Sequence, residues 1–357
     1  MISKMKVHIN NIDGLRAISC IGIIAMHILA NSNYSATEGW MKNTFIPSLT
    51  LLVYLFMMIS GFGMSMGYYE RFKNHTVDFN AFYKRRYIKI LPFFSLLVFL
   101  DIVITRSREH LIQGLAELTM VFGLLPNNQL DVVGVAWFLG VVFLFYMLFP
   151  FFVFLCWTKK RAWVSFIISI ILNVACANYF YTSKFVISGF SNRHTLLYCS
   201  PFLILGELIY LYRLDISRFL SKLKIGVVIP ITITVFFYIS LFFNAKQNFS
   251  NDAVDLETII VFGSWLSYAV GTKQNNYFLS NRVMKYLSSI SMEMYLAQMF
   301  VFDALKKLGV LYLLGRGYLS YTLTLCMTIL GLIILIEVYK LIIKLFKQGH
   351  SKLPFSV

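Results

Sequence analysis

An arginine and a histidine stand eleven residues apart in the first apolar stretch of the sequence. Arg16 comes one helical turn after Asp13, and His27 lies well inside the apolar run over 12–31. At about 100° and about 1.5 Å per residue, both side chains fall on one face of a helix, roughly 16 Å apart along its axis. A histidine at membrane depth can act as a general base toward a hydroxyl group, and an interfacial arginine can hold a phosphate bidentately. We expect this function for the pair, with a snorkelling arginine and a core histidine as the structural alternative.

The composition places this chain among membrane proteins. The sequence of 357 residues is 58% hydrophobic and only 13% charged, with a mean hydropathy of +0.71. A soluble core of this size would need a more polar surface. The net charge of +16 comes from cations placed between apolar runs, where they set topology, so we exclude nucleic acid as a partner. The five cysteines are scattered and show neither a disulfide framework nor metal-ligand spacing.

Apolar runs recur along the whole chain, and the positive-inside rule selects which of them cross the bilayer. If the run at 111–126 does not cross, most lysines and arginines fall on the side of the N-terminus, and otherwise the bias disappears. We therefore expect an all-α polytopic membrane helix bundle of about ten spanning helices, with both termini cytoplasmic and 111–126 re-entrant or interfacial. Residues 1–357 are expected to form one domain. The runs lie at 12–31, 45–69, 88–105, 111–126, 132–157, 163–182, 196–212, 225–244, 257–271, 287–305 and 318–345.

A basic segment precedes the third run, at 82–92. If it is helical, Arg85, Arg86 and Lys89 recur every three or four residues and form a cationic rim suited to a polyphosphate such as coenzyme A. Basic residues beside a membrane span also fix topology and bind anionic lipid without any further role. Both interpretations remain open at this point.

Two further segments have spacing typical of membrane-helix packing. Ser60 and Gly61 lie in the second span, where small residues permit close approach between helices. Trp137 and Tyr146 lie in the span over 132–157, where an interfacial tryptophan is common. Both pairs are expected to support the site structurally.

Three polar side chains stand inside late apolar segments. Glu293 and Gln298 share one of them, and Glu207 lies in another. Such groups must face the bundle interior, either as hydrogen-bond partners between helices or as cavity lining.

Taken in order, these segments resemble the integral-membrane acyltransferase-3 family of bacterial carbohydrate O-acyltransferases. The resemblance runs from residue 11 to about residue 302, and the opening motif is its most specific part. The matching motifs are DGLRA at 13–17 with His27, ISGF at 59–62, FYKRR at 82–86 with KILP at 89–92, Trp137 with FY at 145–146 and Pro150, and IS at 290–291 with YL at 295–296. Many members carry a glutamate where this chain has Val142, and a histidine where it has Gln298. If that glutamate assists the base in relatives, Glu293 or Glu207 would have to replace it here.

The resemblance implies an acyltransferase of the bacterial cytoplasmic membrane that uses acyl-CoA as a co-substrate and has no permanently bound cofactor or metal. Arg16, Arg85, Arg86 and Lys89 would hold the coenzyme A phosphates on the cytoplasmic side, and His27 would be the base. Acetyl is the expected acyl group, with succinyl or a longer group also compatible. The acceptor would be a hydroxyl of a cell-surface or exported polysaccharide or its lipid-linked precursor.

Two other classes of protein fit parts of the pattern. A transporter or flippase could use His27, Glu207 and Glu293 as a proton relay, although transporters often show repeats between halves and none is found here. A polysaccharide polymerase would carry a long external loop, and the longest external stretch here is the 105–132 region.

Overall fold

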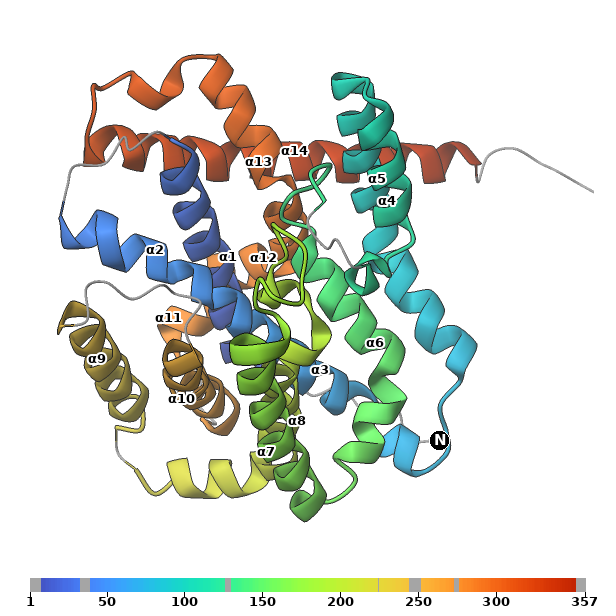
Figure 1. Ribbon diagram of the computed structural model, residues 1–357, viewed down its shortest axis with the longest axis vertical. Helices are drawn as coiled ribbons and strands as arrows, with labels where there is room; N and C mark the ends of the chain where they lie inside the picture. The colour runs from blue at the N-terminus through green and yellow to red at the C-terminus, as the bar shows by residue number, and fades with distance from the viewer. Residues whose placement is uncertain are drawn as a thin grey trace, which may run out of the picture.

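The computed structural model describes residues 8–32, 39–125, 130–223, 225–243, 252–272 and 276–350, and these residues are helical with no strand among them (Figure 1). The all-α class expected from the sequence is therefore confirmed. In chain order, the α-helices are α1 (Asn10–Asn31), α2 (Ile46–Ser48), α3 (Leu52–Lys73), α4 (Phe79–Thr105), α5 (Arg108–Leu118), α6 (Trp137–Leu155), α7 (Lys159–Ala175), α8 (Leu196–Leu220), α9 (Val228–Phe243), α10 (Asp252–Gly271), α11 (Tyr277–Ser280), α12 (Arg282–Ser289), α13 (Ser291–Lys307) and α14 (Tyr318–His350).

Seven helices of the described chain are long and apolar enough to cross a bilayer. They are α1, the continuous segment Met41–Lys73 that ends in α3, α4, α6, the segment Lys159–Phe180 that begins with α7, α8 and α14. The other three of the ten predicted spans correspond to α9, α10 and α13, which are shorter or more polar. The chain is thus a multi-pass helical membrane protein, and the count of ten spans stays a prediction. The predicted side of the termini involves residues 1–7 and 351–357, which lie outside the described residues.

Helix boundaries follow from local chemistry. The Thr158, Asp78 and Thr195 side chains accept hydrogen bonds from backbone N–H groups in the first turns of α7, α4 and α8. Such caps satisfy donors that a helix start otherwise leaves unpaired. α4 ends where Arg106 adopts a left-handed conformation at φ 52°.

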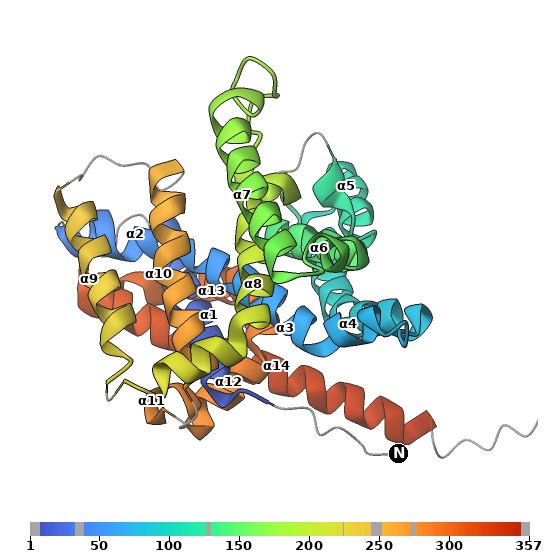
Figure 2. The ribbon, with the colours of Figure 1, turned by 90° about the horizontal axis from the view of Figure 1, so that it is seen from below.

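Helices α3 and α8 form the centre of the bundle, with α7 and α10 beside α8 and α1 packed on α3 (Figures 1 and 2). The apolar windows of α1, α3 and α8 are mostly buried within the protein, whereas those of α4, α7 and α14 are mostly exposed. Exposed apolar side chains such as Ile104, Ile171 and Leu330 lie on these outer helices. An apolar exposed face is what a helix facing lipid tails requires.

Glycines set the closest approaches between helices. A Cβ placed on Gly61 of α3 would lie 2.1 Å from the Leu203 carbonyl oxygen of α8, and one on Gly206 would lie 2.1 Å from the Met58 carbonyl oxygen. Both contacts are to backbone, which cannot rotate away. The small residues of the second span therefore permit close helix packing, as the sequence predicted.

The segment predicted to be re-entrant or interfacial contains a short helix rather than a span. α5 has 11 residues, about 16 Å of helix, which is too short for a hydrocarbon core of about 30 Å. It packs against α4, where Gly114 allows Val98 and Ile102 to approach. The end of the predicted run at Pro126 lies outside the described residues.

Glu117 ties α5 to the segment that leads into α6. The side chain is fully buried, and its Oε1 accepts a hydrogen bond from the Val133 N–H at 3.1 Å. Burial raises the Glu117 pKa to about 7, with the Val133 N–H and His110 opposing the rise and Asp101 and Asp131 adding to it. The carboxyl group is therefore more easily protonated in the folded protein than in the unfolded chain.

Replacing Gly61 with alanine is expected to destabilise the protein by about 1–3 kcal/mol, because the added methyl group clashes with the Leu203 carbonyl. The measurement is thermal unfolding of the detergent-solubilised protein. Gly63→Ala in the same helix is the matched control, since nothing lies within 4 Å of its Cβ position. Equal melting temperatures for the two variants would contradict the proposed close contact between α3 and α8.

Glu117→Gln is expected to stabilise the protein at pH 8 by up to about 3 kcal/mol. A carboxyl group whose pKa is raised on folding weakens the folded state as the pH rises from about 4.5 to about 7, because the folded state binds more protons in that window. The gain should therefore disappear at or below about pH 4.5. Thermal unfolding across pH 4–8 measures it, and a gain that is independent of pH would show that Glu117 does not titrate in this way.

Candidate active site

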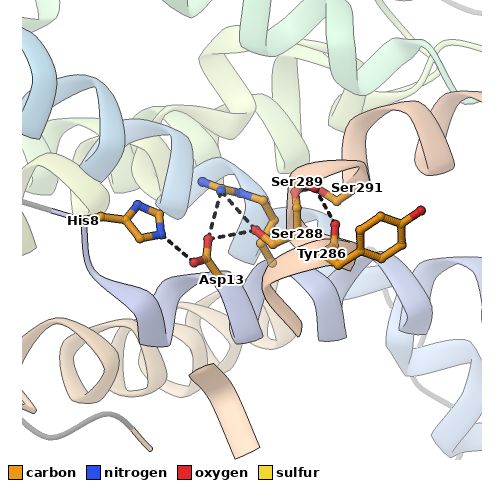
Figure 3. Close-up of polar contacts among 7 residues, drawn as sticks. His8, Asp13, Tyr286, Ser288, Ser289 and Ser291 are labelled. Atoms are coloured by element: carbon orange, nitrogen blue, oxygen red, sulfur yellow. Dashed lines mark hydrogen bonds and ion pairs between the residues drawn. The ribbon is translucent and has the colours of Figure 1, made fainter. Parts of the chain in front are cut away.

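Asp13 organises the first turns of α1 (Figure 3). Its carboxylate is buried, with His8 Nε2 2.6 Å from Oδ2 and the Ser288 hydroxyl donating to Oδ1 at 3.0 Å. Arg16 Nη1 lies 3.9 Å from Oδ1 and donates to Ser288 Oγ at 3.4 Å. Asp13 and Ser288 therefore orient the Arg16 guanidinium, whose side chain remains 35% exposed and free to contact a substrate.

The glycine of the opening motif has a packing role. A Cβ on Gly14 would lie 2.4 Å from the Leu279 Cα of α11, so only glycine allows α1 to approach α11 this closely. The contact brings the start of α1 against α11 and α12, and α12 carries Ser288.

Arg86 projects from α4 into a set of aromatic rings. Its guanidinium carbon lies 4.9 Å from the Tyr68 ring centroid, 5.1 Å from that of Phe82 and 5.4 Å from that of Tyr146. Cation–π contacts of this kind hold an arginine in place without neutralising its charge. Tyr146 is also an electrostatic neighbour of Arg16, which means that it is close enough for their charges to interact. It therefore lies near both the basic segment of α4 and the start of α1.

Lys89 completes a group of cations at this end of the bundle. It is an electrostatic neighbour of Arg16, Arg86 and Glu293. We refer to Arg16, Arg86, Lys89, Tyr146 and Glu293 as the Arg16 cluster. Arg85, the fourth predicted phosphate ligand, is exposed on the same helix and adjacent in sequence to Arg86. Three cations and one carboxylate leave the cluster with a net positive charge.

His27 lies on the same uninterrupted helix, more than halfway to its other end. The side chain is partly exposed, and Arg193 is its electrostatic neighbour. Arg193 belongs to a short 3-10 turn, η5 (Asn192–His194), directly before α8. His27 is therefore near a second cation that is distinct from Arg16.

Arg193 is fixed by neutral groups. Its Nη1 donates to Thr50 Oγ1 at 3.2 Å, and its Nη2 donates to the Thr50 carbonyl at 3.1 Å. The guanidinium carbon lies 5.2 Å from the Tyr54 ring centroid and 5.5 Å from that of Trp137. Thr50 lies in η2 (Leu49–Leu51), a 3-10 stretch within the second long helical segment. Departures from α-helical geometry inside a long helix are frequent at functional positions.

Trp137 and Tyr295 lie beside this arginine. The Trp137 indole stacks on the His194 imidazole, with centroids 4.6 Å apart and planes inclined by 13°. The Tyr295 hydroxyl donates to the Val135 carbonyl at 2.9 Å, and its side chain is an electrostatic neighbour of Arg193. We refer to His27, Arg193, Trp137, Tyr54 and Tyr295 as the Arg193 cluster.

Two helices connect the clusters in opposite directions. α1 runs from Arg16 to His27, about 16 Å along the axis, and α6 runs from Trp137 back to Tyr146, about 13 Å. Each helix places one residue in the Arg16 cluster and one in the Arg193 cluster. Arg16 and His27, which the sequence predicted to act together, thus lie about 16 Å apart along α1, and each has its own set of neighbours.

The remaining predicted residues have supporting positions. Ser60 is partly exposed beside Gly61, and Gln298 is buried with its Nε2 donating to the Tyr295 carbonyl at 2.8 Å. Glu207 is buried on α8 next to Cys156, where α6 ends. The two candidate replacements for the family glutamate therefore have other neighbours, which are Cys156 for Glu207 and Lys89 for Glu293.

Among the described residues, no carboxylate lies within 4.0 Å of the His27 ring. Val142, which stands where many relatives have glutamate, is buried in α6. The three groups considered for a proton relay, His27, Glu207 and Glu293, also have different neighbours: Arg193, Cys156 and Lys89.

The residue that sequence reasoning missed is Arg193. Its signal is topological: it lies directly before the apolar run at 196–212, on the side that the predicted topology makes non-cytoplasmic, where the positive-inside rule does not call for a cation. Tyr54 and Thr50, which hold it, carry no signal in the sequence because their role depends on η5 lying beside them.

A family model described as an acyltransferase domain matches residues 9–338. Because the match covers nearly the whole chain, the protein belongs to the acyltransferase-3 family, and it is a multi-pass membrane acyltransferase. The search of curated proteins and the search of solved structures return no match.

Proposed function

We propose that this protein transfers an acyl group, most simply acetyl, from acyl-CoA to a hydroxyl of a cell-surface or exported polysaccharide or its lipid-linked precursor. The observation that carries the proposal is the position of Arg16 and His27 on one uninterrupted helix, with a group of cations around Arg16. The family supplies the reaction class. The acyl-CoA donor and the polysaccharide acceptor are the parts that we propose.

The Arg16 cluster would bind the coenzyme A phosphates from the cytoplasmic side. Guanidinium groups pair with phosphate oxygens through two parallel hydrogen bonds, and Arg16 is already oriented by Asp13 and Ser288. Arg85, Arg86 and Lys89 add charge around it. Glu293 balances part of this charge and leaves an attractive field for an anion.

The separation between the clusters suits an extended thioester arm. The phosphates would be held near Arg16, while the pantetheine arm would extend along α1 and bring the thioester carbonyl to His27, about 16 Å away. Helix α6 would contribute Tyr146 near the phosphate end of this path and Trp137 near the thioester end.

His27 would take the proton from the acceptor hydroxyl on an imidazole nitrogen. The hydroxyl oxygen then attacks the thioester carbonyl carbon, the tetrahedral intermediate collapses, and the C–S bond breaks. The leaving thiolate receives the proton from the imidazolium, which yields the ester and free coenzyme A. A histidine base of this kind contributes about 10²–10⁴ in rate.

His27→Ala is expected to lower acyl transfer by roughly a hundredfold or more. O-acyl groups on the surface glycan of a producing strain, read by NMR, measure the loss. His75→Asn is the matched control, because His75 is exposed and its left-handed backbone at φ 53° tolerates asparagine. Unchanged ester content in a well-expressed His27→Ala variant would rule out the catalytic role.

Arg16→Ala is expected to raise the KM for acyl-CoA roughly ten- to a hundredfold, the effect of losing one charge-assisted interaction. The control is Arg282→Ala, because Arg282 is exposed on the neighbouring α12. Steady-state kinetics with acetyl-CoA in isolated membranes provide the measurement. An unchanged KM would show that Arg16 does not bind the acyl-CoA.

A further inference from the structure

We propose that Arg193 is a catalytic residue that stabilises the oxyanion of the tetrahedral intermediate formed at His27. This inference rests on the proposed acyl transfer and assigns a second residue to its reaction centre.

The Arg193 guanidinium is held rigidly. Two of its nitrogens donate to the hydroxyl and the carbonyl of a single residue, Thr50, which fixes the plane of the group. The rings of Tyr54 and Trp137 flank it. A catalytic cation is most effective when it is oriented before the reaction, because no free energy is then spent on reorganising it.

The positive charge of Arg193 is not neutralised by a close ion pair. Within the part of the chain that the structure describes, no carboxylate lies within 4.0 Å of the guanidinium, and Asp255 is a more distant electrostatic neighbour. The Nε donor is buried and has no hydrogen-bond partner among these residues. A buried donor without a partner is rare in folded proteins, and each instance calls for an explanation.

Its position relates Arg193 to His27 rather than to Arg16. His27 and Tyr295 are its electrostatic neighbours, and Thr50 lies in η2, which packs against α1. The Arg16 cluster has its own cations at the other end of α1. Arg193 is therefore the cation placed where the acyl carbonyl would react, not where the phosphates would bind.

Acyl transfer places negative charge on the carbonyl oxygen of the thioester, and a cation beside that oxygen stabilises it. When the acceptor oxygen attacks the thioester, the carbonyl π electrons move onto oxygen and form an alkoxide, while the hydroxyl proton goes to His27. The Arg193 cation would stabilise this alkoxide until its electrons re-form the carbonyl and the C–S bond breaks. The leaving thiolate then takes the proton from the His27 imidazolium. In a low-dielectric site, such stabilisation is stronger than in water.

The test compares Arg193→Gln with Arg193→Lys and with a matched control, Arg213→Gln. Arg213 on α8 makes the same kinds of contact, donating to the Tyr210 carbonyl at 2.8 Å and lying 4.1 Å from the Tyr210 ring centroid. Isolated membranes of the producing strain, which contain the natural acceptor, receive radiolabelled acetyl-CoA. Label in glycan and label released as acetate are followed as separate rates, and thermal unfolding of each solubilised variant is measured in parallel.

Arg193→Gln is expected to lower kcat for both glycan acetylation and acetate release by roughly a hundred- to a thousandfold, with an unchanged KM for acetyl-CoA. Both reactions pass through the same kind of oxyanion, so both rates should fall. Arg193→Lys retains the positive charge but not the planar guanidinium with its several donors. Its kcat should therefore lie between those of wild type and Arg193→Gln. Arg213→Gln should match wild type.

Three results would overturn the inference. One is an unchanged kcat in folded Arg193→Gln, and another is a loss of glycan acetylation with normal acetate release, which would make Arg193 an acceptor-binding residue. The third result applies if Arg193→Gln does not fold: a folded Arg193→Lys variant with wild-type kcat would then overturn the inference. Wild-type membranes that do not use acetyl-CoA would instead contradict the proposed function itself, and with it this inference.

Discussion

The structure depends on holding charged side chains inside an apolar helix bundle. The three arginines of the candidate site are half-buried, and each is held by a different set of groups: Asp13 and Ser288 for Arg16, aromatic rings for Arg86, and Thr50 with aromatic rings for Arg193. These contacts keep the guanidinium groups in place while leaving most of their charge available. Charged groups in such surroundings are costly, so their presence in several places supports the proposed binding site and reaction centre.

Close helix packing makes that arrangement possible. Gly61 and Gly206 let α3 and α8 meet through their backbones, and Gly14 does the same for α1 and α11. Because these helices form the buried centre, the outer helices α4 and α14 can present apolar faces to lipid. Helices α1 and α6 each contribute one residue to the Arg16 cluster and one to the Arg193 cluster.

The sequence predicted the helical class and most helical ranges because each depends on local pattern, and the same kind of pattern made Arg16 and His27 candidates for the site. Apolar runs of sufficient length specify spans, and the eleven-residue spacing places Arg16 and His27 on one helix face. The distribution of cations along the chain predicted that the run at 111–126 does not cross, and the 11-residue α5 is too short to span a bilayer. The sequence could not show that Glu293 would be a neighbour of Lys89, since those residues lie about 200 positions apart.

The sequence by itself determined the helical class, and it placed most of the polar residues proposed for the site on particular helices. Only the tertiary structure decided which of them meet. Arg193 is the clearest example: its position beside His27 depends on a 3-10 turn before α8 meeting a 3-10 stretch before α3. Contacts between segments so distant in sequence are set by packing of the whole bundle, and no periodicity or spacing encodes them.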